Sequence, residues 1–338
     1  MSDTYKNNST GILQDKPPVN ISNIILSSMK WEGGSHVGFD GTISKSLIQA
    51  IEAGMYSLQI FIGSPQSYNR SKITMDDVEL TATLLNRFPT NLFIHTPVVY
   101  NLAGKKDALA WAGNAKQDAT TQHIINGIQY ELSVLSNILS RVNEKSKRRT
   151  GVVVHPGSYP DKEKGLEAIG KTINKIDFIG DAKLLLENAS GGGTKLATTF
   201  EEIRTIIDHI EPTKRKNIGV CVDTAHIFGF GSYDLREESE VDRMFYEFDN
   251  IIGSERFTLL HLNDSKCSHE KRHDAPFGSG KDKHELLGYG YIWDNNLETL
   301  LYLLTKCKQR GIPVVLETNP CDMATLLKLS ECNDGLKV

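Results

Sequence analysis

Asp223 and His226 could together bind a metal ion. They follow Gly219-Val220-Cys221-Val222, an apolar run with the composition of a buried strand. A parallel strand buried on both faces is almost wholly apolar, so a carboxylate at its end is costly unless something pairs with the charge. A bound cation would compensate Asp223, with the imidazole of His226 as a second ligand. One Asp-x-x-His pair is nevertheless a weak signal, because such pairs are common by chance.

The same pattern, an apolar run followed by a histidine or a carboxylate, recurs along the chain. The candidate ligands are His95, His155, Glu187, Asp223, His226, His261 and Glu317 at such ends, and Asp282 and His284 in a later loop. Each alone is explained as well by ordinary hydrogen bonding. As a group without metal they would repel one another or stay unsatisfied. Imidazole and carboxylate without thiolate suit zinc or manganese, and nine ligands would serve three ions if one carboxylate bridges.

Buried strands must position these residues. The apolar, β-branched runs are Tyr56–Ile62, Leu92–His95, Gly151–His155, Lys183–Glu187, Ile218–Asp223, Phe257–Leu262 and Ile312–Glu317. A further strand is expected between Asn23 and Val37, where two interpretations remain open. Ile24–Met29 is the more apolar run, but Gly33-Gly34-Ser35-His36 has the character of a strand end.

Segments with helical periodicity separate the strands. They are Ser44–Ala53, Asp76–Phe88, Asp118–Val142, Glu163–Ile176, Thr199–Ile210, Val241–Ile252, Asn296–Cys307 and Met323–Leu329. About eight alternations of strand and helix predict an α/β protein, a (β/α)8 TIM barrel. A doubly wound sheet would need a Gly-rich first turn, which is missing. In a barrel, the C-terminal ends of all strands meet at the face that carries active sites, so the nine candidates should converge.

Composition sets the remaining limits. At 338 residues, 39% hydrophobic and 24% charged, the chain suits one large globular domain, expected over residues 21–338. Residues 1–20 are polar and are expected to form a disordered extension. Five scattered cysteines indicate an intracellular, reducing compartment, and no apolar run has the length of a membrane helix. The net charge of −4 gives no hint of a nucleic-acid partner.

Six motifs in order resemble those of endonuclease IV, the zinc-dependent apurinic/apyrimidinic endonuclease family of base-excision repair. The resemblance covers roughly Gly34 to Pro320. Its motifs are Val154-His155-Pro156-Gly157-Ser158, Leu186-Glu187-Asn188 with Gly191-Gly192-Gly193-Thr194, Cys221-Val222-Asp223-Thr224-Ala225-His226, His261-Leu262-Asn263-Asp264-Ser265-Lys266, Asp282-Lys283-His284-Glu285-Leu286-Leu287-Gly288-Tyr289-Gly290 and Leu316-Glu317-Thr318.

The resemblance implies a centre of three Zn2+ ions per chain and a monomeric enzyme acting on duplex DNA. The first zinc would be bound by His95, His155 and Glu187. The second would share Glu187 and add Asp223, His261 and Glu317, and the third would be bound by His226, Asp282 and His284. The implied reaction is hydrolysis of the phosphodiester 5′ to an abasic site, with Glu187 orienting the nucleophile. His36 matches a family residue near the mouth that is not a ligand.

Two features depart from the family. Its usual arginine and tyrosine that enter the DNA stack are replaced by Gln66 and Val98, so Tyr68 and Tyr100 are the aromatic candidates for stacking. The loop from Cys267 to Lys281 is longer than in typical relatives and contains Arg272-His273-Asp274, a decoy for the Asp282-Lys283-His284 ligands. Contacts with the DNA backbone are expected from Arg70, Lys266 and Lys283.

Two other functions compete with this one. A metal-dependent sugar isomerase or epimerase would use a related barrel, but its one or two ions would leave several of the nine ligands unused. A catalytically silent protein that binds DNA lesions is the second alternative, and the intact ligand set argues against it. The number of bound metal ions and a cleavage assay on abasic DNA separate the three.

Overall fold

The computed structural model describes residues 33–104, 115–268, 273–294 and 296–318 of the chain. The predicted extension at residues 1–20, the run Ile24–Met29 and the predicted helix Met323–Leu329 lie outside these residues. Of the helices that the structure describes, none combines the length and the apolarity needed to cross a membrane.

Eight parallel strands close into a barrel in the order β1-β10-β7-β6-β5-β4-β3-β2. They are β1 (Gly33–His36), β2 (Ser57–Ile60), β3 (Asn91–His95), β4 (Thr150–Val154), β5 (Leu184–Glu187), β6 (Ile218–Asp223), β7 (Phe257–His261) and β10 (Val314–Leu316). A separate antiparallel pair, β8 (Asp264–Ser265) and β9 (His284–Glu285), follows β7. The closed parallel barrel confirms the predicted fold.

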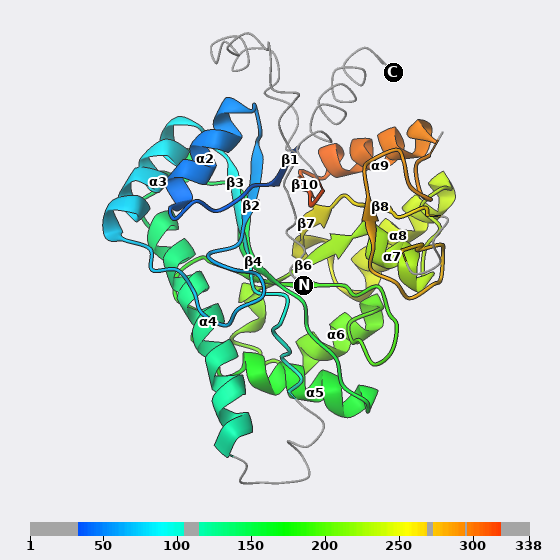
Figure 1. Cartoon of the computed structure of the whole chain (residues 1–338), viewed down its shortest axis with the longest axis horizontal. Helices are drawn as coiled ribbons and strands as arrows, with labels where there is room; N and C mark the ends of the chain where they lie inside the picture. The colour runs from blue at the N-terminus through cyan, green and yellow to red at the C-terminus, as the bar shows by residue number, and fades with distance from the viewer. Residues whose placement is uncertain (1–32, 105–114, 269–272, 295, 319–338) are drawn as a thin grey trace, which may run out of the picture.

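Helices surround the barrel (Figure 1). They are α2 (Ile43–Glu52), α3 (Met75–Arg87), α4 (Ala115–Leu139), α5 (Lys162–Ile173), α6 (Phe200–Asp208), α7 (Thr224–Phe230), α8 (Glu238–Ile251) and α9 (Leu297–Gln309). Short 3-10 turns occur at Glu144–Ser146, Arg215–Asn217 and Ser254–Arg256. Three helices begin at threonines whose side chains accept a hydrogen bond from a backbone N–H of the first turn, namely Thr42, Thr74 and Thr199. Each such cap contributes about 1 kcal/mol.

The first strand is Gly33–His36, which settles the ambiguity left by the sequence. It pairs with β2 and β10, so it closes the barrel. Its composition has a steric reason, because a Cβ placed on Gly34 would lie 1.6 Å from the carbonyl oxygen of Ser57. The backbones of β1 and β2 therefore approach too closely for any side chain at this position.

Candidate metal centre

Strand alternation positions six of the nine candidate ligands. The barrel interior contains one buried apolar layer, made of Phe93, Val153, Leu185, Cys221, Leu259 and Val315. Each of these six residues is followed, two positions later in the sequence, by a candidate ligand. These ligands are His95, His155, Glu187, Asp223, His261 and Glu317. Successive side chains of a strand point to opposite faces, so these six share the inward direction of the apolar layer. The ligands thus form the next layer up, at the C-terminal mouth.

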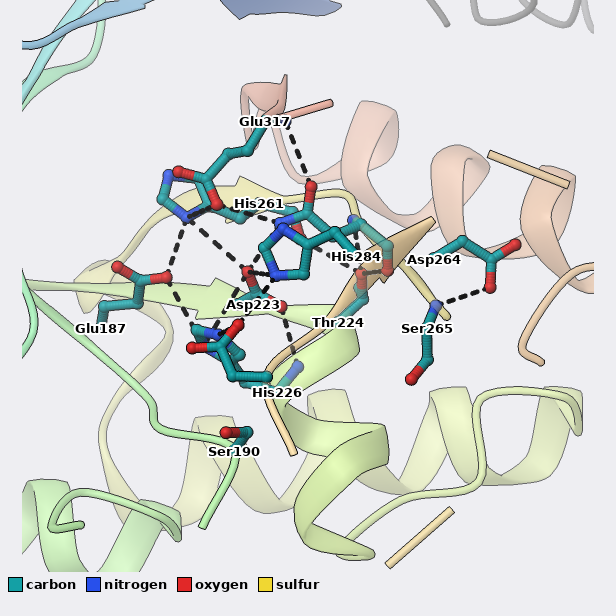
Figure 2. A network of polar contacts seen from close by, with 12 residues as sticks. Glu187, Ser190, Asp223, Thr224, His226, His261, Asp264, Ser265, His284 and Glu317 are labelled. Carbon is teal, nitrogen blue, oxygen red and sulfur yellow. Dashed lines mark hydrogen bonds and ion pairs between the residues drawn. The ribbon is translucent and has the colours of Figure 1, made fainter. Parts of the chain in front are cut away.

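Figure 2 shows Glu187, Asp223, His226, His261, His284 and Glu317 pointing toward one another. The donor atoms of these six residues and of His95 and His155 fall into three groups, and the atoms of each group lie within 4.8 Å of one another. The groups are His95 with His155 and Glu187, then Glu187 with Asp223, His261 and Glu317, and finally Asp223 with His226 and His284. Glu187 and Asp223 each belong to two groups, so the three form one continuous cluster.

Glu187 is the centre of the cluster and is fully buried. Its Oε2 lies 3.2 Å from Nε2 of His95 and 3.6 Å from Nε2 of His155. Its Oε1 lies 3.0 Å from Nδ1 of His261. Burial by itself raises the pKa of Glu187, but His155 and His261 outweigh it and hold that pKa well below its usual range. The carboxylate is therefore ionised, with one oxygen directed to each of two groups.

Asp282, from the loop before β9, lies beside the third group. Its Oδ1 lies 3.1 Å from Nε2 of His226 and 3.4 Å from Nε2 of His284. Burial lowers the pKa of His226, but Asp223 and Asp282 outweigh it and raise that pKa to about 10. In the described part of the chain, His273 belongs to none of the three groups. The structure thus brings Asp282 and His284 to His226, and their joint binding of a metal ion stays a prediction.

Backbone carbonyls select which ring nitrogen of two histidines faces the cluster. Nδ1 of His95 donates to the carbonyl of Thr96 at 2.7 Å, and Nδ1 of His226 donates to the carbonyl of Asn188 at 2.8 Å. For His95, Nε2 is then the nitrogen directed at Glu187. For His226, Nε2 faces Asp282, while Nδ1 also lies 3.6 Å from Oε1 of Glu187. Hydrogen bonding of the remote nitrogen to a carbonyl is typical of histidines that bind metal.

Two asparagines hold Asp223. Its backbone N–H donates to Oδ1 of Asn188 at 2.6 Å, and its Oδ2 accepts from Nδ2 of Asn263 at 2.7 Å. Its Oδ1 accepts from the backbone N–H of His226 and so caps α7. Both asparagines lie within the sequence motifs, but their role as partners of Asp223 was not predicted. For Asn188 the available signal was its position directly after Glu187, and for Asn263 its position two residues after His261.

The cluster fits a set of divalent cations. Nε2 of His226 and Nε2 of His284 are buried, and Asp282 is the carboxylate that both face. Both face Asp282 at distances that a cation between them would bridge. Burying so many ionisable groups is unfavourable unless charge is compensated. The donors are imidazole and carboxylate, which suit zinc.

Comparison with known proteins agrees with this geometry. Residues 146–329 match the model of a family described as a xylose isomerase-like TIM barrel. A probable endonuclease 4 from Nitrosopumilus maritimus is 31% identical over 84% of this chain and 92% of its own length. The chain belongs to the endonuclease IV family. A probable endonuclease 4 from Halothermothrix orenii is 30% identical over the same shares.

Solved structures show the same fold. Endonuclease IV from Thermus thermophilus superposes with a TM-score of 0.69 at 24% identity, covering 90% of this chain and 100% of that one. A D-tagatose 3-epimerase-like protein superposes with a TM-score of 0.59 at 17% identity, covering 90% of this chain and 98% of that one. At such identities the likeness concerns the fold alone. The barrel is therefore shared between nuclease and epimerase families, and the ligand cluster must distinguish them.

Two residues expected to contact DNA are buried, which corrects that prediction. The Arg70 side chain is 5% exposed, donates to the carbonyls of Ile62 and Ser64, and pairs with Glu131 at 3.4 Å. Tyr100 is 3% exposed. The two terminal nitrogens of the Arg70 guanidinium donate to loop carbonyls and brace the loop from inside, so neither residue of this endonuclease IV family member presents a surface to DNA.

The other candidates for DNA contact are accessible. Gln66 is exposed, Tyr68 and Val98 are 41% and 43% exposed, and the Tyr68 ring stacks on the buried Tyr100 ring at 5.7 Å. Lys283 is exposed, whereas Lys266 lies 3.4 Å from Glu285. The exposed candidates follow β2, β3 and β7, and so lie on loops at the mouth that carries the ligand cluster.

Proposed function

We propose that this protein is a DNA-repair endonuclease that hydrolyses the phosphodiester 5′ to an abasic site in duplex DNA, leaving a 3′-hydroxyl and a 5′-deoxyribose phosphate. The observation that carries the proposal is the position of Glu187. Its two carboxylate oxygens face two different ligand groups, and Asp223 joins the second of these to a third. A cluster divided in this way suits three ions, the number that the family resemblance implies.

The residues present would hold zinc in three places. His95, His155 and Glu187 would bind one ion, and Glu187, Asp223, His261 and Glu317 a second. His226, Asp282 and His284 would bind the third. The structure adds a detail to this assignment, because Asp223 also lies in the group of His226 and His284. When bound, zinc lowers the pKa of a coordinated water to roughly 7 and neutralises charge on a phosphate.

The chain's own residues orient that chemistry. Glu187 is held between histidines from β3 and β7, so its carboxylate has one fixed direction. The side chains of His155, Asp282 and His284 are 28%, 37% and 21% exposed, whereas those of Glu187, Asp223 and His261 are fully buried. A phosphodiester therefore enters over the first and third groups. Glu187 and Asp223 lie beneath it and need no movement to reach the cluster.

Side chains at the mouth suit a duplex with a missing base. Gln66, Tyr68 and Val98 project from neighbouring loops, and an exposed aromatic ring stacks on bases without sequence preference. Lys283 and Lys266 lie on the other side of the cluster, beside β9 and β8, and would contact phosphates. The net charge of −4 does not oppose this assignment, since three divalent ions add about six positive charges at the mouth.

The alternative, a metal-dependent sugar isomerase or epimerase, has only the shared fold in its favour. The experiment that tests the proposal is nicking of a duplex with one abasic site, with and without chelator. We expect cleavage by zinc-loaded protein, loss of cleavage with chelator, and recovery when zinc is restored. Cleavage that is unaffected by chelator, or zinc-loaded protein that leaves the abasic duplex intact, would sink the proposal.

A further inference from the structure

Gln59 is a fully buried amide inside the barrel mouth. It lies on β2, where Leu58 and Ile60 belong to the core between barrel and helices. Alternation therefore directs Gln59 inward, among the candidate ligands. A buried primary amide needs partners for both its oxygen and its nitrogen, so the identity of those partners is informative.

Two ligands of the proposed second ion provide these partners. Oε1 of Gln59 lies 2.8 Å from Nε2 of His261, and Nε2 of Gln59 lies 2.8 Å from Oε1 of Glu317. The orientation of the amide follows from chemistry, because an ionised carboxylate only accepts. Its neighbour must be the amide N–H, which leaves Oε1 to accept a hydrogen bond from the Nε2–H of His261. The reversed amide would set an oxygen against the carboxylate.

This hydrogen bond fixes the tautomer of His261. With the proton on Nε2, the lone pair of the neutral ring is on Nδ1. Nδ1 lies 3.0 Å from Oε1 of Glu187, 3.4 Å from Oε2 of Glu317 and 4.0 Å from Oδ2 of Asp223. The lone pair is therefore directed at the three carboxylate oxygens that complete the group.

The arrangement parallels that of two other histidines with one difference. Backbone carbonyls hold the remote nitrogens of His95 and His226, whereas a side chain does so for His261. The same side chain also fixes Glu317 through Oε1, which leaves Oε2 of Glu317 facing Nδ1 of His261. Gln59 thus orients two ligands of one ion, and it can be changed by mutation without altering a ligand.

We propose that Gln59 is a positioning residue for the second ion, because it sets the tautomer of His261 and the carboxylate orientation of Glu317. The proposal rests on the proposed function in one respect, namely that a cation is bound by the group of Glu187, Asp223, His261 and Glu317. Removing such an outer hydrogen bond typically weakens metal binding 10- to 100-fold. The other two ions use neither His261 nor Glu317, but they share Glu187 and Asp223 with the second ion, so binding of the second ion should weaken most and binding of the other two less.

The test is zinc retention during titration with a competing chelator, followed for the wild-type chain, Gln59→Met and Ser57→Ala. Methionine has nearly the length of glutamine but neither hydrogen bond. Ser57 lies on the same strand, is equally buried, and its hydroxyl accepts from Asn91 at the strand end remote from the mouth. We expect Gln59→Met to release one ion about 10- to 100-fold more readily and Ser57→Ala to match the wild type. Wild-type retention of all ions by Gln59→Met would overturn the proposal.

A measurement on the unaltered protein covers the case in which Gln59→Met does not fold. Nitrogen-15 NMR of labelled histidines in the zinc-loaded chain should show His261 with a hydrogen-bonded proton on Nε2. A proton on Nδ1 would contradict the proposal. Failure of the wild-type chain to bind zinc would count against the proposed function. Wild-type zinc binding with an unaffected Gln59→Met would count against the role of Gln59 alone.

Discussion

Oδ1 of Asp282 lies 3.1 Å from Nε2 of His226, although Asp282 comes from the loop before β9 and His226 from helix α7. His284 reaches the same carboxylate oxygen from β9, at 3.4 Å. The long segment between β8 and β9 therefore returns to the mouth at Asp282 rather than at His273. This relationship makes Asp282, rather than His273, the candidate to complete the third group.

The first prediction concerns that group. Asp282→Ala should lose about one of roughly three zinc ions and most nicking activity, because His226 and His284 are left under-coordinated. The matched control is His273→Ala, in the same loop and outside the three groups, which should keep both zinc and activity. Elemental analysis of the purified variants measures the outcome. Zinc loss in His273→Ala together with full retention in Asp282→Ala would reassign the third site.

The second prediction concerns the shared carboxylate. Glu187→Gln should slow nicking by more than the 10- to 100-fold that outer residues typically cost, because a neutral amide replaces the charge between two groups. Binding of abasic duplex, measured by fluorescence anisotropy, should survive, since the exposed mouth is unchanged. Glu201→Gln, an exposed residue of α6, is the control and should behave as wild type. Near-normal turnover in Glu187→Gln would refute the central role of this residue.

The third prediction concerns DNA stacking. Tyr68→Ala should weaken binding of abasic duplex about 5- to 150-fold, which corresponds to roughly 1–3 kcal/mol for one stacked base. The zinc content should not change, because Tyr68 contacts Tyr100 and the backbone of Val99 rather than a ligand. Tyr246, 70% exposed on α8, provides the control Tyr246→Ala. Equal affinities of both variants and the wild type would remove Tyr68 from the DNA surface.

The fourth prediction concerns Glu131, which is fully buried beside Arg70. Burial raises the pKa of Glu131 from 4.5 to about 8, against the opposing effect of Arg70. A carboxyl group with a raised folded-state pKa binds its proton more tightly in the native state. Its contribution to stability is complete below pH 4.5 and is lost as the pH rises through 8.

Glu131→Gln removes this titration while keeping the size of the side chain. Relative to wild type, its free energy of unfolding should increase by at least about 1 kcal/mol between roughly pH 5 and pH 8.5. Urea denaturation of both proteins at the two pH values measures this difference, in which titrations common to both cancel. A difference that is independent of pH would show that Glu131 titrates normally.

Much of the fold and of the ligand set follows from the sequence, for a specific physical reason. Apolar runs that end in His95, Glu187 or Asp223 predict both a buried strand and a candidate metal ligand at its end. The barrel then brings all such ends to one face, so residues far apart in sequence could be grouped without coordinates. The first strand was harder to place, because Gly33-Gly34 has no apolar side chain. Gly34 instead allows the backbones of β1 and β2 to approach closely.

What the sequence could not predict depends on side-chain direction and burial. Arg70 and Tyr100 lie in the expected loops, but their side chains point inward, where loop carbonyls and Glu131 engage the guanidinium. Gln59 lies on β2 between the apolar residues Leu58 and Ile60. Its hydrogen-bond partners, His261 and Glu317, follow it by more than two hundred positions in the sequence. Such partners emerge only when the barrel closes.

The most direct test of the account is cleavage of a labelled duplex with a single abasic site, beside the same duplex with the base intact. Zinc-loaded protein should cut only the first, once, on the 5′ side of the lesion, and should leave a 3′-hydroxyl that a polymerase extends. Equal cutting of both duplexes, or an end that a polymerase cannot extend, would contradict the account.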